Sequence, residues 1–155
     1  KYRIVPDCIK SWISKKELII RNANATRPWQ HVLEPLSGYL TLASSLSANL
    51  KLNGESFNFG PSDLDTYTVE DLVIEIAKFF PESNWSIEDK KNKPHEANLL
   101  SLDCRKAKKI LNWESKLNFN QTAEWTSKWY HDYYTEGPEA AVNLTKKQIN
   151  DYTND

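Results

Sequence analysis

The chain contains no methionine, only two cysteines and only four glycines in 155 residues. Four scattered glycines cannot supply a glycine-rich dinucleotide or phosphate loop. No tyrosine is followed four residues later by a lysine, and the three histidines show no metal-ligand spacing. Cys8 and Cys104 are too few for a disulfide framework, which favours a reduced, cytoplasmic protein. The chain therefore shows no catalytic apparatus of its own.

Strong net charge and long apolar runs are absent as well. A formal net charge of -1 gives no general attraction to nucleic acid, and no apolar run approaches the ~20 residues that span a bilayer. We therefore expect neither nucleic acid nor a membrane as a partner. The chain opens on KYRIVPDC, without a signal peptide or an initiator methionine, so we expect a fragment of a longer protein. Its length and its 39% hydrophobic content predict one globular domain.

The first sixty residues mix helical and extended patterns. Val5, Cys8 and Trp12 share one helical face, whereas ESFNFG alternates apolar and polar residues before a turn. The sequence predicts, in order, a helix over 5–13, a strand over 17–20, a loop over 22–28, an extended piece over 29–32, a helix over 33–46 and a strand over 55–60.

The remaining residues continue with helices. Thr68 and Asp71 have the spacing of a capping box, and Asp103 is a candidate cap for the following helix. The sequence predicts a helix over 69–80, a polar loop over 86–98, a strand over 98–102, a helix over 104–111, a long helix over 118–136 and a loosely packed tail over 139–155.

These elements predict a small helix-rich α/β domain of α+β character, with short strands in separate places. Regular βαβ alternation is missing, so we expect no complete Rossmann sheet. We divide the chain into a binding domain, residues 1–138, and a C-terminal tail, residues 139–155.

The densest group of candidate binding residues lies just before the second predicted helix. The Arg27 guanidinium can bind a phosphate with two parallel hydrogen bonds, or it can form a structural ion pair with a carboxylate such as Glu34. Trp29 can stack on a base or sugar, or it can belong to the core. His31 can contact a ligand or be a hydrogen-bonded core histidine.

Two other patterns have a structural and a functional interpretation. Basic residues gather over 90–93 and 105–109, where they can form solvated surfaces or attract a pyrophosphate. Trp125, Trp129 and Tyr133 are spaced four residues apart, which is typical of a core stripe.

Five stretches in order resemble one enzyme family. They are RIVPDC, IIRNANATRPWQHVLEPLSGYLTLA, ESFNFGPSD, PHEANLLSLDCRKAKKILNW and TAEWTSKWYHDYY. Together they resemble the C-terminal part of the CDP-glucose 4,6-dehydratases, which are extended short-chain dehydrogenases/reductases. The resemblance implies a nucleotide-sugar binding domain of an NAD-dependent lyase of deoxysugar biosynthesis. The family's NAD-binding loop, its Tyr-x-x-x-Lys pair and its acid–base residues precede RIVPDC.

The resemblance also implies roles for individual residues. Arg27 matches an arginine that contacts the nucleotide diphosphate, and Arg3 matches a position near the phosphate and hexose. Ile19, Ile20 and Arg21 match the short strand beside the pyrimidine base. His95 and Glu96 fall where related epimerases have a second phosphate-binding arginine, and Lys93 could take that cationic role. Trp29 and His31 are expected to shape the site by locking the loop against the following helix.

Two hypotheses follow. In the first, the chain is the substrate-binding part of a CDP-glucose 4,6-dehydratase. It would bind CDP-glucose or CDP and would need the missing N-terminal Rossmann half as a partner. Alone, it would bind no NAD and would not turn over substrate. In the second, it is a non-enzymatic interaction or structural module that keeps the fold and associates with itself through an exposed apolar face.

Overall fold

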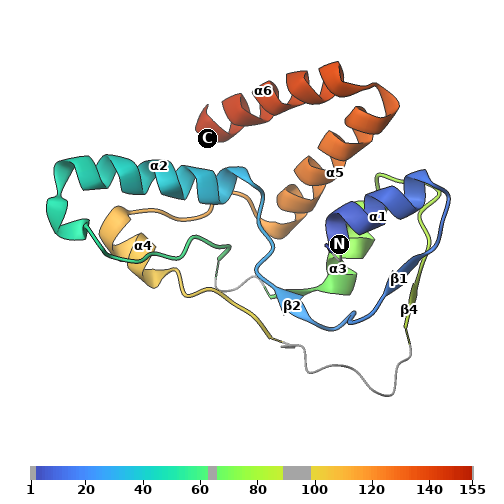
Figure 1. Ribbon diagram of the computed structural model, residues 1–155, viewed down its shortest axis with the longest axis horizontal. Helices are drawn as coiled ribbons and strands as arrows, with labels where there is room; N and C mark the ends of the chain where they lie inside the picture. Colours follow the sequence, from blue (N-terminus) through green and yellow to red (C-terminus); the bar gives the residue numbers. More distant parts are fainter. Residues whose placement is uncertain (1–2, 63–65, 89–98, 155) are drawn as a thin grey trace.

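The computed structural model describes residues 3–62, 66–88 and 99–154 (Figure 1). Within these residues the elements follow in the order α1 (Ile4–Ile13), β1 (Leu18–Ile20), β2 (Thr26–Arg27), α2 (Leu33–Ala48), the 3-10 turn η1 (Leu50–Leu52), β3 (Tyr67–Thr68), α3 (Val69–Ala77), β4 (Trp85–Ile87), α4 (Arg105–Leu111), α5 (Phe119–Thr135) and α6 (Pro138–Asn154).

The strands form two separate pairs rather than one sheet. β1 pairs with β4 in parallel, with Ile19 opposite Ser86, and β2 pairs antiparallel with β3, with Arg27 opposite Tyr67. This arrangement confirms the helix-rich fold with short strands and, over the described ranges, without a complete Rossmann sheet. No helix of the described part is both long and apolar enough to cross a bilayer.

The main core joins α1, β1, α3 and the start of α5. The predicted face of the first helix is confirmed, because Cys8, Ile9 and Trp12 are buried there. The Trp12 Nε1–H donates to the carbonyl oxygen of Asn84 at 2.9 Å, which links α1 to the segment before β4. The capping box of Thr68 and Asp71 is also confirmed at the start of α3.

A second core lies between α2 and α4. It contains Leu52, Phe59, Ala107, Leu111 and Trp113. The Phe59 ring lies edge-on to Trp113 at 4.9 Å between ring centroids. The Phe59 ring also lies against the backbone of α2 at Gly38. The approach is so close that a residue with a Cβ does not fit there.

Gly38→Ala is therefore expected to destabilise the protein. Alanine favours a helix over glycine by about 1 kcal/mol, but a Cβ at position 38 would lie 2.3 Å from Phe59 Cδ1. Displacing a buried ring typically costs about 1–3 kcal/mol, so the steric effect prevails. Urea unfolding would measure it, with Ser44→Ala on the exposed side of α2 as the control. A more stable Gly38→Ala protein would contradict this packing.

Three predicted extended segments are not strands. The structure has no strand at residues 29–32 or at residues 55–60. The third segment has none over its described residues, 99–102. The alternation in 55–60 does bury Phe59, but no neighbouring strand pairs with it within the described residues. Burial of alternate side chains is therefore not sufficient for a strand, which also needs a backbone partner.

Residues 139–154 correct the expectation of a loosely packed tail. They belong to α6, which packs on α5 as a helical hairpin with its C-terminal end beside the start of α2 (Figure 1). There the Tyr152 hydroxyl donates to the buried Glu34 carboxylate at 2.8 Å. The backbone N–H groups of Lys116 and Leu117 donate to the same carboxylate. Glu34 thus joins α2, α6 and the segment before α5.

Candidate functional site

A polar cleft of about 620 Å³ lies beside β2. Its walls come from residues 26–28, from residues 61, 62 and 66, and from residues 99–103 and 105, just before and at the start of α4. Arg27 and Arg105 contribute two guanidinium groups and Asp103 contributes a carboxylate. Serine and threonine hydroxyls and the side chains of Leu99, Leu100 and Leu102 complete the wall.

Arg27 lies at the end of β2, where pairing with β3 and the following Pro28 fix its backbone. Its Nη1–H donates to the carbonyl oxygen of Thr26 at 2.7 Å, and the residue is half-buried at the cleft wall. Glu34, the alternative ion-pair partner, is fully buried and accepts hydrogen bonds from Lys116, Leu117 and Tyr152. Glu34 is thus engaged elsewhere in the fold.

Arg105 is held against Asp103 by charge-assisted hydrogen bonds. Its Nε–H donates to Asp103 Oδ1 at 2.9 Å and its Nη2–H donates to Oδ2 at 2.6 Å. Hydrogen bonds from Arg105 lower the pKa of Asp103 to about 2. The same carboxylate accepts the backbone N–H of Arg105 at 3.0 Å, but the N-cap residue of α4 is Cys104, which makes no side-chain cap, so the predicted cap at Asp103 lies one residue too early.

Arg105 is the cleft residue that the sequence did not single out. It appeared only as one member of the basic run over 105–109. Two neighbours of that run bind carboxylates elsewhere, since Lys106 pairs with Glu55 at 2.6 Å and Lys108 with Glu114 at 2.7 Å. The run is therefore mainly a surface of ion pairs, and only its first member lines the cleft.

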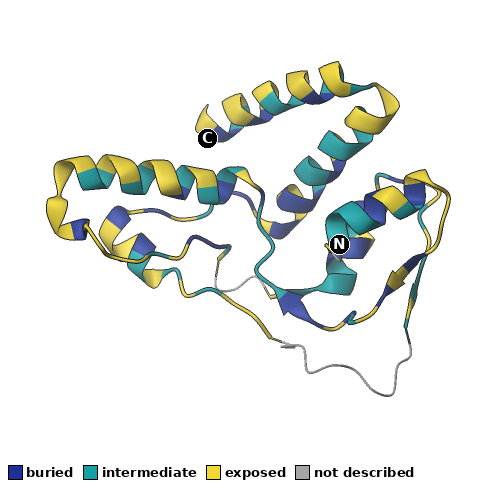
Figure 2. Ribbon diagram, in the orientation of Figure 1, coloured by how far each residue is buried: buried dark blue, intermediate teal, exposed yellow. Residues whose placement is uncertain are grey.

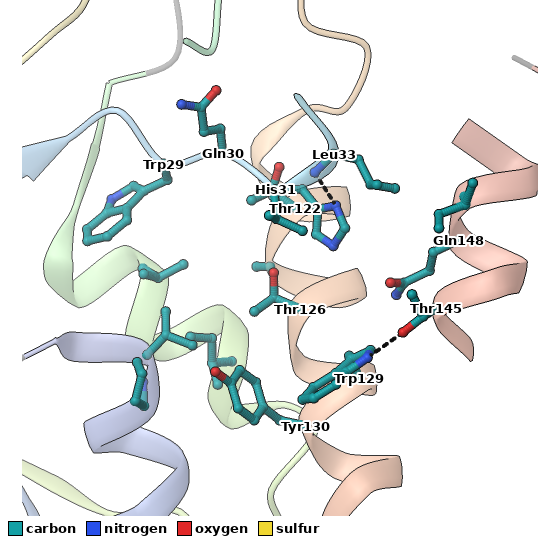
Figure 3. Close-up of a pocket in the computed structure, with 17 residues that line it drawn as sticks. Trp29, Gln30, His31, Leu33, Thr122, Thr126, Trp129, Tyr130, Thr145 and Gln148 are labelled. Atoms are coloured by element: carbon teal, nitrogen blue, oxygen red, sulfur yellow. Dashed lines mark hydrogen bonds between the residues drawn. The ribbon is translucent and has the colours of Figure 1, made fainter. Parts of the chain in front are cut away.

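Trp29 and His31 point to the other side of the same segment. They line a second, apolar cavity of about 390 Å³ between α1, α3, α5 and α6 (Figure 3). The Trp29 Nε1–H donates to the carbonyl oxygen of Tyr67 at 3.1 Å, which ties the segment to β3. His31 is buried, lies edge-on to Trp125 of α5, and accepts the Leu33 N–H at 3.4 Å. Both rings therefore hold the segment in place.

The aromatic stripe of α5 is only partly a core stripe. Trp125 contacts His31, and Trp129 lines the apolar cavity with its Nε1–H donating to Thr145 of α6 at 2.8 Å. Tyr133 stacks on Trp129 but is 39% exposed. The helical spacing correctly placed the three rings on one face of α5. That face meets α6 and the apolar cavity rather than the main core.

The other candidate residues do not line the cleft. Arg3 precedes α1 as its N-terminal cap residue and is exposed. In β1, Ile19 is 59% exposed whereas Ile20 is 2% exposed in the main core, so only the backbone of Ile20 is available to a ligand. Arg21 is exposed just after β1. The predicted sites at Lys93, His95 and Glu96 lie outside the described residues.

The glycines do not fit a dinucleotide-binding turn. Gly38 and Gly60 pack against side chains of the second core and its border, whereas Gly54 and Gly137 have positive φ and face open space, where an added Cβ would meet no atom within 4 Å. A Rossmann turn needs clustered glycines between a strand and a helix, with backbone N–H groups facing a pyrophosphate. The described residues contain no such turn and no cluster of metal-ligating side chains.

Solved structures with the same fold are sugar-nucleotide enzymes. A UDP-glucuronic acid 4-epimerase from Bacillus cereus, solved with UDP-glucuronic acid and NAD, superposes with a TM-score of 0.70 at 18% identity, over 86% of this chain and 41% of that chain. A dTDP-glucose 4,6-dehydratase from Bacillus anthracis, solved with NAD, gives a TM-score of 0.63 at 18% identity, over 92% and 42%. No family model matches the chain.

The fold is that of the C-terminal part of the extended short-chain dehydrogenases/reductases that act as sugar-nucleotide epimerases and dehydratases. Within this class, the chain is homologous to the C-terminal part of CDP-glucose 4,6-dehydratase. It is 39% identical to that enzyme from Salmonella typhimurium over 153 residues, which is 98% of this chain and 42% of the relative. A UDP-glucose 4-epimerase from Mycoplasma pneumoniae is 21% identical over 84% of this chain and 40% of the relative. The chain thus spans less than half the length of these relatives.

Proposed function

We propose that this chain is the substrate-binding part of a CDP-glucose 4,6-dehydratase, which converts CDP-glucose to CDP-4-keto-6-deoxyglucose with bound NAD. The observation that carries the proposal is 39% identity over 98% of the chain to an enzyme of that name. In this proposal NAD and the groups that transfer protons and hydride belong to a separate N-terminal part. The chain alone binds substrate weakly and does not turn it over.

The polar cleft supports this proposal through its charge. Its described wall carries two guanidinium groups and one carboxylate, and guanidinium groups are well suited to bind a diphosphate. Arg27 would contact the diphosphate with its planar fork, while Arg3, Ile19, Ile20 and Arg21 would contact the hexose and the pyrimidine. Lys93, His95 and Glu96 complete the proposed substrate-binding residues. Because guanidinium groups match phosphate oxygens in pairs, Arg27 would fix orientation as well as add affinity.

The outer face of α2 supports the need for a second half. Glu34 is the only charged residue among the 16 of α2, and it is buried. On the exposed face, Val32, Leu36, Tyr39 and Leu40 are 47–73% accessible (Figure 2). Contiguous exposed apolar patches commonly mark interaction sites. We therefore assign this α2 face to contact with the N-terminal Rossmann half.

Reconstitution tests this proposal. The N-terminal part of the Salmonella typhimurium relative, which the alignment leaves uncovered, is mixed with this chain, NAD and CDP-glucose. We expect 4-keto sugar to form only in the mixture. Leu40→Glu, at a residue that is 73% exposed, should abolish activity of the mixture, because a carboxylate at an apolar contact is costly to bury.

Val142→Glu on the outer side of α6 is the matched control, and it should leave the reconstituted activity unchanged. Turnover by this chain without the N-terminal part would contradict the proposal. So would a mixture that forms a complex by light scattering, binds NAD and yet produces no 4-keto sugar.

The same α2 face favours a second candidate, a non-enzymatic module that associates with itself. In that case light scattering shows a dimer of this chain that Leu40→Glu converts to a monomer, and calorimetry detects no binding of CDP-glucose. A monomer that binds CDP-glucose contradicts the second candidate.

A further inference from the structure

The apolar cavity is separate from the polar cleft. Residues 26–28 line the cleft, whereas residues 29–33 line the cavity, and no residue lines both. The two hollows therefore lie on opposite sides of one short segment. A volume of about 390 Å³ is within the range of about 300–1,000 Å³ that is typical of small-molecule sites.

The walls of the cavity exclude a charged ligand. None of the 17 residues that line it is Asp, Glu, Lys or Arg. Burial lowers the pKa of His31 below its ordinary value, so this ring is neutral at neutral pH. An ion would lose its hydration without gaining a partner, which costs several kcal/mol or more. Three large rings on the walls, those of Trp29, Trp129 and Tyr130, favour another flat ring.

The His31 ring offers a hydrogen-bond donor that can orient such a ligand. His31 Nδ1 accepts the Leu33 N–H, so the neutral ring carries its proton on Nε2. Figure 3 shows this second nitrogen directed toward the space between Thr126 of α5 and Gln148 of α6. Two neighbouring donors are engaged within the protein, because Trp129 donates to Thr145 and Gln148 donates to the carbonyl oxygen of Trp125. No described residue accepts the Nε2–H of His31.

We propose that this cavity is a second binding site, for a neutral aromatic molecule that carries one hydrogen-bond acceptor. The ring lies among Trp29, Trp129 and Tyr130, and the acceptor takes the Nε2–H of His31. The site is distinct from the diphosphate cleft and does not depend on the proposed function.

Quinoline is a suitable probe, since it is flat, neutral at pH 7.5 and has a ring nitrogen as acceptor. N-methylquinolinium has nearly the same shape but carries a charge and no acceptor. In an NMR titration of the 155-residue chain, we expect quinoline to saturate with a Kd below about 1 mM. Amide shifts should concentrate at residues 29–33 and 145–149, and N-methylquinolinium should bind at least about tenfold more weakly.

Two substitutions locate the ligand. His31→Phe keeps an aromatic ring but removes the donor, and it should weaken quinoline about tenfold. Ile149→Trp should fill the cavity from the α6 side and abolish binding, whereas Val142→Trp, also exposed on α6 but outside the cavity, should not. This pair gives a result even if His31→Phe fails to fold. Equal affinity for the charged analogue, or unchanged binding by Ile149→Trp, would overturn the proposal.

Discussion

Replacing Glu34 by alanine is expected to lower the free energy of unfolding by about 2–5 kcal/mol, because it breaks a buried hydrogen-bond network. Glu34 is 0% exposed, and its carboxylate accepts hydrogen bonds from Lys116, Leu117 and Tyr152. Alanine leaves the Lys116 and Leu117 N–H groups without their acceptor and leaves the Tyr152 hydroxyl with Ser37 Oγ alone, and each buried group without a partner costs about 1–3 kcal/mol. Because a small domain has only about 5–15 kcal/mol in total, Glu34→Ala should be partly unfolded at 37 °C.

A surface glutamate gives the matched control. Glu124 pairs with Lys128 one turn later on α5, and its side chain is 44% exposed. Glu124→Ala should change the stability by less than about 0.5 kcal/mol. Tyr152→Phe removes only one donor and should give an intermediate loss of about 1 kcal/mol. Urea unfolding measures the free energy of unfolding of the three variants. A Glu34→Ala protein as stable as Glu124→Ala would contradict the role of Glu34 in joining α2, α6 and the segment before α5.

The hydrogen bonds of Glu34 illustrate which parts of the fold could be predicted from sequence, because they join residues that are far apart in the chain. Helices with a local signal were predicted correctly, because Cys8, Ile9 and Trp12 at helical spacing and the Thr68–Asp71 box depend only on nearby residues. The packing of α6 depends on Tyr152 meeting Glu34, which is 118 residues away. No local pattern contains that contact, so the last helix was mistaken for a loose tail.

The candidate site divides in the same way. Arg27 was predicted as a site residue from its place after a loop and from the family resemblance, and it does line the polar cleft. Arg105 was missed, because the sequence of a basic run does not show which of its members lines the cleft with Arg27. For Trp29 and His31, the sequence left core and ligand roles open. The structure places both on the opposite side of the segment from Arg27.

Removing the Arg27 guanidinium is expected to have the largest effect on nucleotide binding. The backbone of Arg27 is held by the pairing of β2 with β3 and by the hydrogen bond from Trp29, two residues later, to Tyr67 of β3. Little backbone freedom is therefore lost when a diphosphate binds. Charge-assisted hydrogen bonds to phosphate contribute about 1.5–3 kcal/mol. Arg27→Ala should therefore weaken CDP binding by about 10- to 100-fold in calorimetry.

Arg27→Lys keeps the charge but not the planar fork, so it should recover only part of the affinity. Lys146→Ala, which removes an exposed cation on α6 away from the cleft, should have no effect. Circular dichroism of each variant checks that the chain remains folded when the Arg27 side chain is changed. If Arg27→Ala binds CDP as tightly as the unmodified chain, the diphosphate does not lie in this cleft. If Arg27→Lys restores full affinity, charge alone rather than paired hydrogen bonding holds the ligand there.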